Sequence, residues 1–289
     1  MSKKAFLYII LAGIFWGTSG IYVHYLAPLG LSSMQITTIR GIISAVAMSV
    51  YLFYYDKKLF RVSGKEILLF VLSAVAMYFT SVFYFYSMQL TSVSTAVVLM
   101  YTAPIIVLIY SVTFLGERLN TVKVISIIAM VIGCALVSGI VGGFKFSALG
   151  LLFGFGSGFA YSSYNIITKI QMQKKINPIT ASTYTFIFMC IISIFCSDTG
   201  AVLRVAAIRP DSILLMIGCG VCTCIAPYFL YTLALRTLPA GTASALAIVE
   251  PMAATIMSVL FLGEVLTPWS IAGIVLILGS VYMLGKSNR

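Results

Sequence analysis

The chain is a succession of long apolar runs separated by short segments rich in polar and turn-forming residues. Each run has roughly 20 residues, the length at which a helix crosses the hydrocarbon core of a bilayer. Turn formers such as Pro28-Leu29-Gly30 and Asn177-Pro178 lie between the runs, where the chain must reverse. The pattern predicts ten membrane-spanning helices at 6–26, 34–55, 67–88, 93–115, 122–141, 148–169, 179–196, 212–235, 241–262 and 269–285.

Composition supports an all-α membrane protein. Of 289 residues, 61% are hydrophobic and 9% are charged, whereas a soluble domain carries about 25% charged residues. The six cysteines lie in or beside apolar runs, where a thiol packs as a small hydrophobe. Cys219, Cys222 and Cys224 are close in sequence but have no His or carboxylate near them, so we expect no metal and no cofactor.

The basic residues predict the orientation of the helices. Of the 18 Lys and Arg residues, Arg40 lies within a span. An N-terminus in the cytoplasm places only Lys145, Arg204 and Arg209 outside and all the others inside. Because cytoplasmic loops carry the excess of Lys and Arg, both termini are expected in the cytoplasm. The net charge of +11 then reflects loop anchors at the lipid surface, not a nucleic-acid interface.

The sequence also contains an internal repeat. A shift of 147 residues aligns 84–120 with 231–267 at about a third of positions, including Pro104 with Pro251. Phe114-Leu115-Gly116-Glu117 then aligns with Phe261-Leu262-Gly263-Glu264. The repeat predicts two five-helix halves, 1–143 and 144–289. Since five is odd, the second half enters the membrane in the opposite direction, as in many secondary transporters that work by alternating access.

Pro104 and Pro251 lie in the middle of the aligned helices. Each lacks a backbone N–H and should break its helix, leaving the carbonyl of Met100 or Ala247 without its helical donor. Such breaks are tolerated in a membrane where they are buried or line a cavity. The prolines therefore indicate either a binding site between the halves or a kink needed for packing.

These motifs, together with Leu11-Ala12-Gly13-Ile14-Phe15-Trp16-Gly17 in the first helix, resemble the EamA-type family of the drug/metabolite transporter superfamily. The resemblance covers essentially the whole chain. It implies that helices one, three, four, six, eight and nine surround a central cavity. It does not imply one cargo, since members export amino acids, other metabolites or drugs, and some import vitamins or choline-like compounds. Phe159-Ala160-Tyr161 departs from the family pattern, in which a tryptophan is common.

Two charged residues remain inside the predicted spans, Glu250 and Arg40. A charge at this depth costs about 2.5–3.5 kcal/mol, so each calls for a partner or a function. Glu250 aligns with Ala103 and is specific to the second half; it could carry a proton, hold an ammonium group, or bond to a neighbouring helix. Arg40 lies nearer the outer surface and could reach Glu250, act in gating or extend to the headgroups. His24, near the outer end of the first helix, fits an interfacial residue or a pH sensor.

Polar aromatic residues lie well inside the spans, although Tyr and Trp usually collect at the interfaces. A buried tyrosine needs a hydrogen-bond partner, which packing, water or substrate can supply. The candidate substrate-binding residues, besides Glu250 and Arg40, are Trp16, Tyr78, Tyr101, Tyr161, Asn165 and Tyr228.

The sequence therefore predicts a secondary transporter, not an enzyme, in the plasma membrane. It would export amino acids or similar amphipathic compounds, with protons as one coupling ion to consider. Its partners would be this small-molecule substrate and the lipid bilayer, with the oligomeric state left open. An importer of a cationic vitamin or choline-like compound is the alternative within transport. An intramembrane enzyme or receptor is the alternative of another class, but the clustered catalytic groups expected of an enzyme are missing from the sequence.

Overall fold

The computed structural model describes residues 3–117, 120–140, 147–263 and 265–287, and the regular structure over these residues is helical. The first half forms α1 (Lys3–Gly17), α2 (Ser19–Leu26), α3 (Ser33–Tyr55), α4 (Gly64–Leu90), α5 (Val93–Met100), α6 (Ala103–Phe114) and α7 (Thr121–Val137). The second half forms α8 (Ala148–Gln173), α9 (Pro178–Cys196), α10 (Thr199–Ile208), α11 (Ser212–Gly220), α12 (Ala226–Leu235), α13 (Ala240–Leu246), α14 (Val249–Leu262) and α15 (Pro268–Ser287). The predicted boundary after residue 143 lies outside the described residues.

Eight helical segments in the described part of the chain are long and apolar enough to cross a membrane. The other two predicted spans correspond to α7, with 17 residues, and to α8, with 26 residues and a more polar sequence. Large apolar side chains such as Ile109, Leu152, Phe195 and Leu214 are exposed on the outer faces. Because a soluble monomer rarely exposes such continuous apolar surface, these faces are the lipid contact of a multi-pass membrane protein.

Helix ends follow local sequence signals. Ser32 and Ser63 begin α3 and α4 with capping boxes, in which the serine side chain accepts from the backbone three residues later. Gly116 and Gly263, the glycines of the repeated Phe-Leu-Gly-Glu motif, have φ angles of +66° and +71°. Only glycine adopts this left-handed conformation without strain, so the motif ends α6 and α14 in the same way. Glu264 itself lies outside the described residues.

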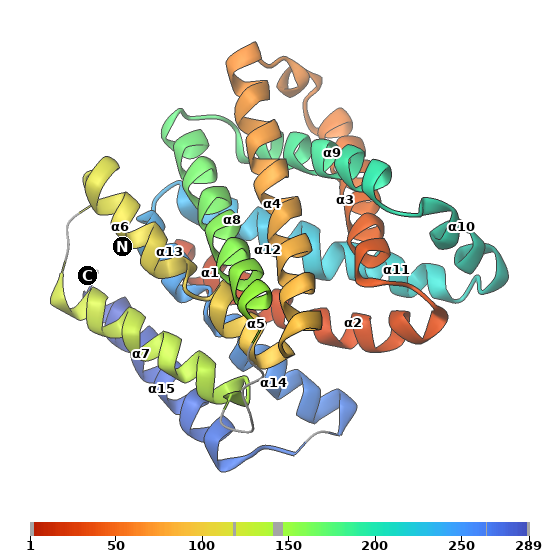
Figure 1. Ribbon diagram of the computed structural model, residues 1–289. Helices are drawn as coiled ribbons and strands as arrows, with labels where there is room; N and C mark the ends of the chain where they lie inside the picture. Colours follow the sequence, from red (N-terminus) through yellow and green to blue (C-terminus); the bar gives the residue numbers. More distant parts are fainter. Residues whose placement is uncertain (1–2, 118–119, 141–146, 264, 288–289) are drawn as a thin grey trace.

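The two halves interleave (Figure 1). The helix pairs α4–α8, α3–α9 and α7–α15 each join one half to the other. In addition, α1 packs on α12 and α14 of the second half, while α8 packs on α4, α5 and α6 of the first. The first helix of each half therefore lies against the third and fourth spans of the other half. Phe6 in α1 approaches Gly285 in α15, so the helices at both chain ends meet at one end of the bundle.

Three features differ from the predicted helices. The first span is divided at Thr18 into α1 and α2. The segment after residue 196, expected to be a loop, contains α10, whose first turn is capped by the Asp198 side chain. The eighth span is interrupted by a π-helical turn, Val221–Ile225, just before Pro227. Hydrophobicity alone misses the first and third features because each keeps the apolar composition of its run, and it misses α10 because this helix is too short to count as a span.

Candidate functional site

Glu250 and Tyr101 join the two broken helices at the centre of the bundle. The Tyr101 hydroxyl donates to Glu250 Oε2 at 2.6 Å. Tyr101 lies in the break between α5 and α6, and Glu250 lies in the first turn of α14, directly after the break that follows α13. The hydrogen bond therefore connects equivalent helices of the two halves.

Each of the two proline-containing spans is interrupted two to four residues before its proline. Residues 101–102 and 247–248 are turns, followed by α6 with Pro104 and α14 with Pro251. The Ala247 carbonyl, however, is not left unpaired as predicted. The Glu250 N–H donates to it at 3.0 Å, because a tighter turn replaces the bond that Pro251 cannot make.

Small residues bring neighbouring helices close to both breaks. A Cβ on Gly13 would lie 3.3 Å from the Glu250 nitrogen, and a Cβ on Gly17 would lie 2.7 Å from the Ala253 Cβ. On the other side, a Cβ on Gly158 would lie 2.9 Å from the Leu99 carbonyl oxygen. Helices α1 and α8 therefore pack against the broken helices at a distance that only glycine permits.

An aromatic cluster lies beside this pair. The Trp16 ring centroid is 5.0 Å from that of Tyr228, 5.6 Å from that of Tyr231 and 6.5 Å from that of Tyr161. Tyr164 also contacts Tyr228, at 5.3 Å. Trp16 Nε1 and the hydroxyls of Tyr161 and Tyr231 are buried without a hydrogen-bond partner among the described residues. Unsatisfied buried donors are costly, so this cluster is suited to a polar ligand or water.

Tyr164 and Tyr231 were not among the predicted site residues. Tyr231 aligns with Tyr84 at the start of the repeat, and that match could have indicated it. Tyr164 has no comparable sequence signal. Its position depends on how α8 is rotated about its own axis.

Arg40 is directed into the bundle. Its Nη2 donates to the Thr223 carbonyl oxygen at 2.8 Å, and its Nε is buried without a partner among the described residues. The guanidinium therefore lies against the π-helical turn of the eighth span and does not extend to the headgroups.

Glu250 has ionisable side chains of several elements around it. It interacts with ionisable side chains contributed by six surrounding helices or breaks, namely Arg40, Tyr84, Tyr101, Cys134, Tyr161 and Tyr228. Arg40 and Glu250 attract each other but do not form one of the ion pairs of the described residues. Neither charge is therefore neutralised by direct contact with the other.

The remaining candidates, Asn165, Tyr78 and His24, have neighbours of their own. Asn165 is fully buried, and its Nδ2 lies 3.4 Å from Ser244 Oγ while its Oδ1 has no partner among the described residues. Tyr78 pairs with Phe79 of the same helix and interacts with Cys196 at the end of α9. His24 is exposed and packs on Tyr25, as an interfacial residue would.

Burial along the ninth span changes at Glu250. All residues from Ala240 to Val249 are buried, and Glu250 is the first that keeps some accessible surface. The aligned segment of the fourth span is more open, since Val93 is exposed and Val97 and Met100 are half-buried. Equivalent segments of the repeat are therefore in unequal environments.

A polar cluster, which we term the Glu117 cluster, surrounds the start of α13 and consists of Glu117, Lys123 and Lys169. Glu117 accepts from the Ala240 N–H and pairs with Lys123 Nζ at 3.1 Å. Lys169 Nζ donates to the carbonyls of Leu235 and Leu238 at 2.9 and 2.6 Å. The Glu117 cluster thus ties the Phe-Leu-Gly-Glu motif of the first half to the start of the ninth span, on the predicted cytoplasmic side.

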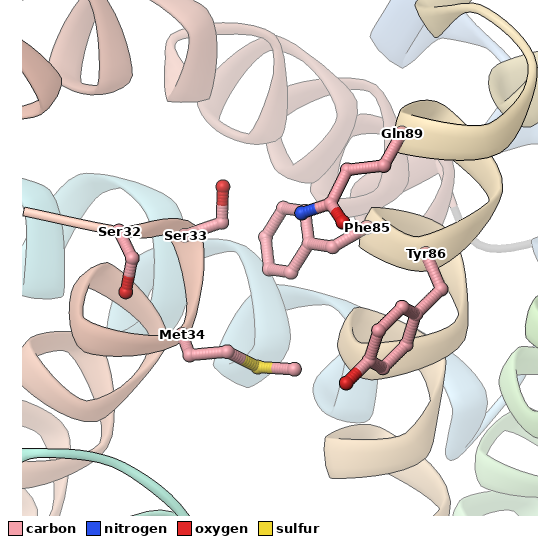
Figure 2. A pocket seen from close by; sticks show the side chains of 6 residues that line it. All are labelled: Ser32, Ser33, Met34, Phe85, Tyr86 and Gln89. Carbon is pink, nitrogen blue, oxygen red and sulfur yellow. The ribbon is translucent and has the colours of Figure 1, made fainter.

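A pocket of about 180 Å³ lies between the start of α3 and the end of α4. Ser32, Ser33 and Met34 line it from the start of α3, and Phe85, Tyr86 and Gln89 line it from the last turns of α4. In Figure 2 the Met34 thioether and the Tyr86 ring extend into the space between the two helices. This pocket is separate from the Glu250–Tyr101 pair.

Comparisons with known proteins agree with this architecture. The EamA-like transporter family matches residues 3–139 and 148–286. The uncharacterized transporter YwfM of Bacillus subtilis is 27% identical over 287 residues, which cover 98% of this chain and 94% of that protein. The uncharacterized inner membrane transporter YicL of Salmonella typhimurium is 23% identical, covering 100% of this chain and 97% of that protein.

A crystal structure of a protein with 16% sequence identity has the same fold, with a TM-score of 0.82 over 98% of this chain and 96% of the other. The family matches occupy both predicted halves and leave only short segments between and beside them. The chain has two transporter domains of one kind, a lipid-facing apolar surface and a polar site between the halves. The general class of this protein is therefore a transporter and not an enzyme. The chain is a membrane transporter that belongs to the EamA-like transporter family.

Proposed function

We propose that this protein is a secondary active transporter of the plasma membrane that exports amino acids or similar small amphipathic compounds by alternating access. The observation that carries the proposal is the Tyr101–Glu250 hydrogen bond, which places a carboxylate between the broken helices of the two halves. Discontinuous helices form substrate sites near the midplane in other secondary transporters. The inner membrane location in the name of the Salmonella relative supports the same compartment.

Ten spans in two inverted halves are part of this proposal. The chain ends meet at one end of the bundle, as an even number of spans requires. The packing pattern is unchanged when the halves are exchanged, since α1 lies on the third and fourth spans of the second half as α8 does on those of the first. Such symmetry supports a pseudo-two-fold axis between the halves.

The unequal burial of the two broken helices supports a conformation closed toward the cytoplasm. The buried segment Ala240–Val249 begins at the Glu117 cluster, whereas its repeat equivalent is partly open. In an inverted repeat, the opposite conformation follows when the two halves exchange these environments. The structure then corresponds to one of two states of the cycle.

Glu250 has the chemistry for binding a cationic group or for carrying a proton. The aromatic rings around Trp16 offer faces to an ammonium group, and the carboxylate supplies the opposite charge. A protonatable Glu250 would face Arg40, Tyr84, Tyr101, Cys134, Tyr161 and Tyr228. The same carboxylate favours, as a second candidate function, import of a cationic vitamin or choline-like compound.

Transport in proteoliposomes tests the proposal. Wild type, Glu250→Gln and Tyr101→Phe would be compared with and without a pH gradient, using radiolabelled amino acids and choline as probes. We expect substrate movement that Glu250→Gln abolishes or uncouples from the gradient and that Tyr101→Phe weakens. Glu66→Gln is a matched control, because Glu66 caps α4 within one half. Unchanged transport and pH response in Glu250→Gln would refute the role given to this carboxylate, and choline accumulation would favour the importer.

A further inference from the structure

Arg40 and Glu250 are opposite charges that share the centre of the bundle without pairing. The ion pairs of the described residues, defined by a nitrogen–oxygen distance of at most 4.0 Å, join Lys123 to Glu117, Arg204 to Asp198 and Arg209 to Asp211. Arg40 and Glu250 nevertheless attract each other electrostatically. Each of the two residues keeps accessible surface although neighbouring atoms surround both side chains. Neither charge is therefore neutralised by a direct ionic partner among the described residues.

Pro227 explains how Arg40 is anchored. A proline removes the N–H that would bond to the carbonyl four residues earlier, which here is the carbonyl of Thr223. Arg40 Nη2 donates to this carbonyl at 2.8 Å. The π-helical turn Val221–Ile225 widens the eighth span at the same point, and such turns are frequent at functional sites.

This anchor uses only part of the guanidinium. An arginine side chain has five N–H donors. Among the described residues, Arg40 Nη2 has the Thr223 carbonyl as its acceptor, and the buried Nε has no acceptor. Cys219, Cys224 and Tyr228 lie close to the group, and none of the ion pairs of the described residues includes it. A fixed fork with free donors is the arrangement that binds a carboxylate with two parallel hydrogen bonds.

We propose that Arg40 is the anion-binding group of the central site and that the cargo carries an anionic group for Arg40 and a cationic group for Glu250. The inference rests on the proposed transport function and adds a requirement to it, namely that the cargo bears both charges. A compound with both groups neutralises the two interior charges together, which a simple amine or a simple acid cannot do. Arg40 is then the residue that makes the site bind zwitterions more tightly than amines.

Matched ligand pairs test the proposal. The probes are phenylalanine with phenethylamine, and leucine with 3-methylbutylamine, which differ only in the carboxylate. Binding to purified wild type, Arg40→Gln, Arg40→Lys and Glu250→Gln would be measured by thermal shift and by competition of transport. Arg40→Gln removes the charge but keeps a polar amide at the position, and Arg40→Lys keeps the charge without the planar fork.

In wild type we expect the amino acid to bind about 10- to 150-fold more tightly than its amine, the factor of a charge-assisted hydrogen bond. Arg40→Gln should remove this preference while amine binding changes little, and Arg40→Lys should restore part of it. Glu250→Gln should weaken both members of each pair.

Two results would overturn the role of Arg40 while leaving transport intact. The first is an equal affinity of wild type for the amino acid and its amine. The second is an equal loss of affinity for both compounds in Arg40→Gln, which would indicate a structural role only. If wild type moved neither amino acids nor amines, the proposed cargo itself would be wrong, and the inference with it.

Discussion

Replacing Glu117 by glutamine should make the start of α13, at the predicted cytoplasmic end of the ninth span, more accessible to solvent. One carboxylate oxygen accepts from the Ala240 N–H, and the other pairs with Lys123 Nζ at 3.1 Å. Glutamine keeps an oxygen for the Ala240 N–H but removes the counter-ion of Lys123. The Ala240 bond links the two halves, and with glutamine its acceptor is no longer charged, so the state in which the halves are joined here should be destabilised.

The burial of the pair sets the magnitude. The Lys123 and Glu117 side chains keep 7% and 10% of their surface, so solvent screens them far less than a surface pair. Breaking a fully buried ion pair costs about 3–5 kcal/mol, and losing a hydrogen bond to a charged group costs about 1.5–3 kcal/mol. The lower range, about 1.5–3 kcal/mol, applies because glutamine retains the bond to Ala240 and both side chains keep some exposed surface. This free-energy change corresponds to a shift of about 10- to 150-fold toward the state in which the start of α13 is exposed.

Accessibility of a buried cysteine measures this shift. Thr242 is fully buried in α13, and its hydroxyl has no hydrogen-bond partner among the described residues, so Thr242→Cys is a mild reporter. In a background without the six native cysteines, a membrane-impermeant maleimide would be added from the cytoplasmic side. Glu117→Gln should raise the labelling rate by the factor above. Glu66→Gln removes a carboxylate that bonds only within its own half and should not raise it.

The double variant Glu117→Gln with Lys123→Gln adds a second check. It removes the unpaired lysine and should return part of the lost stability, because the cost comes largely from the buried charge left without a partner. An unchanged labelling rate in Glu117→Gln, in a protein that still transports, would refute the reasoning.

Three further predictions concern stability, measured as thermal unfolding of the purified protein in detergent. Gly17→Ala should destabilise by about 1–3 kcal/mol because its Cβ would lie 2.7 Å from a side-chain carbon of α14; Gly20→Ala, with no atom within 4 Å, is the control and should be neutral or slightly stabilising, since alanine favours the helix. Gly116→Ala should cost about 1–2 kcal/mol, since the φ of +66° is strained for alanine, and Gly116→Asn should cost less. Tyr231→Phe should be neutral or stabilising because its buried hydroxyl is unpartnered, whereas Tyr101→Phe should lose about 1.5–3 kcal/mol with its bond to Glu250; the opposite order would contradict the assignment of the site.

The sequence predicted the spans and the breaks because both depend on local chemistry. Apolar runs of membrane length form helices wherever no water can satisfy the backbone, and Pro104 and Pro251 interrupt them for reasons internal to each helix. The repeat added the equivalence of the two breaks. Nothing in those arguments required knowledge of a neighbouring helix.

Contacts between helices were harder to predict. In a soluble helix the apolar stripe shows which side faces the core, but in a membrane the lipid-facing side is just as apolar. Leu152 is exposed and Tyr164 is buried on the same helix, α8. The partners of Glu117 and Arg40, far away in sequence, could therefore not be read from periodicity. Pro227 was the available signal for Arg40, because it predicts a free Thr223 carbonyl.

The site combines repeated and unrepeated residues, and the two kinds have different roles. The prolines, the glycines of the Phe-Leu-Gly-Glu motif and the helix breaks occur in both halves, so they provide backbone geometry that either half can adopt. Glu250 aligns with Ala103 and Tyr101 aligns with Ile248, so the hydrogen bond between the breaks exists only once. A symmetric scaffold can exchange the environments of its halves, whereas an oriented cargo needs chemistry that the symmetry does not duplicate. It follows that variants of the repeated residues should change the rate of interconversion for every cargo, while variants of Glu250, Tyr101 and Arg40 should change which cargo is moved.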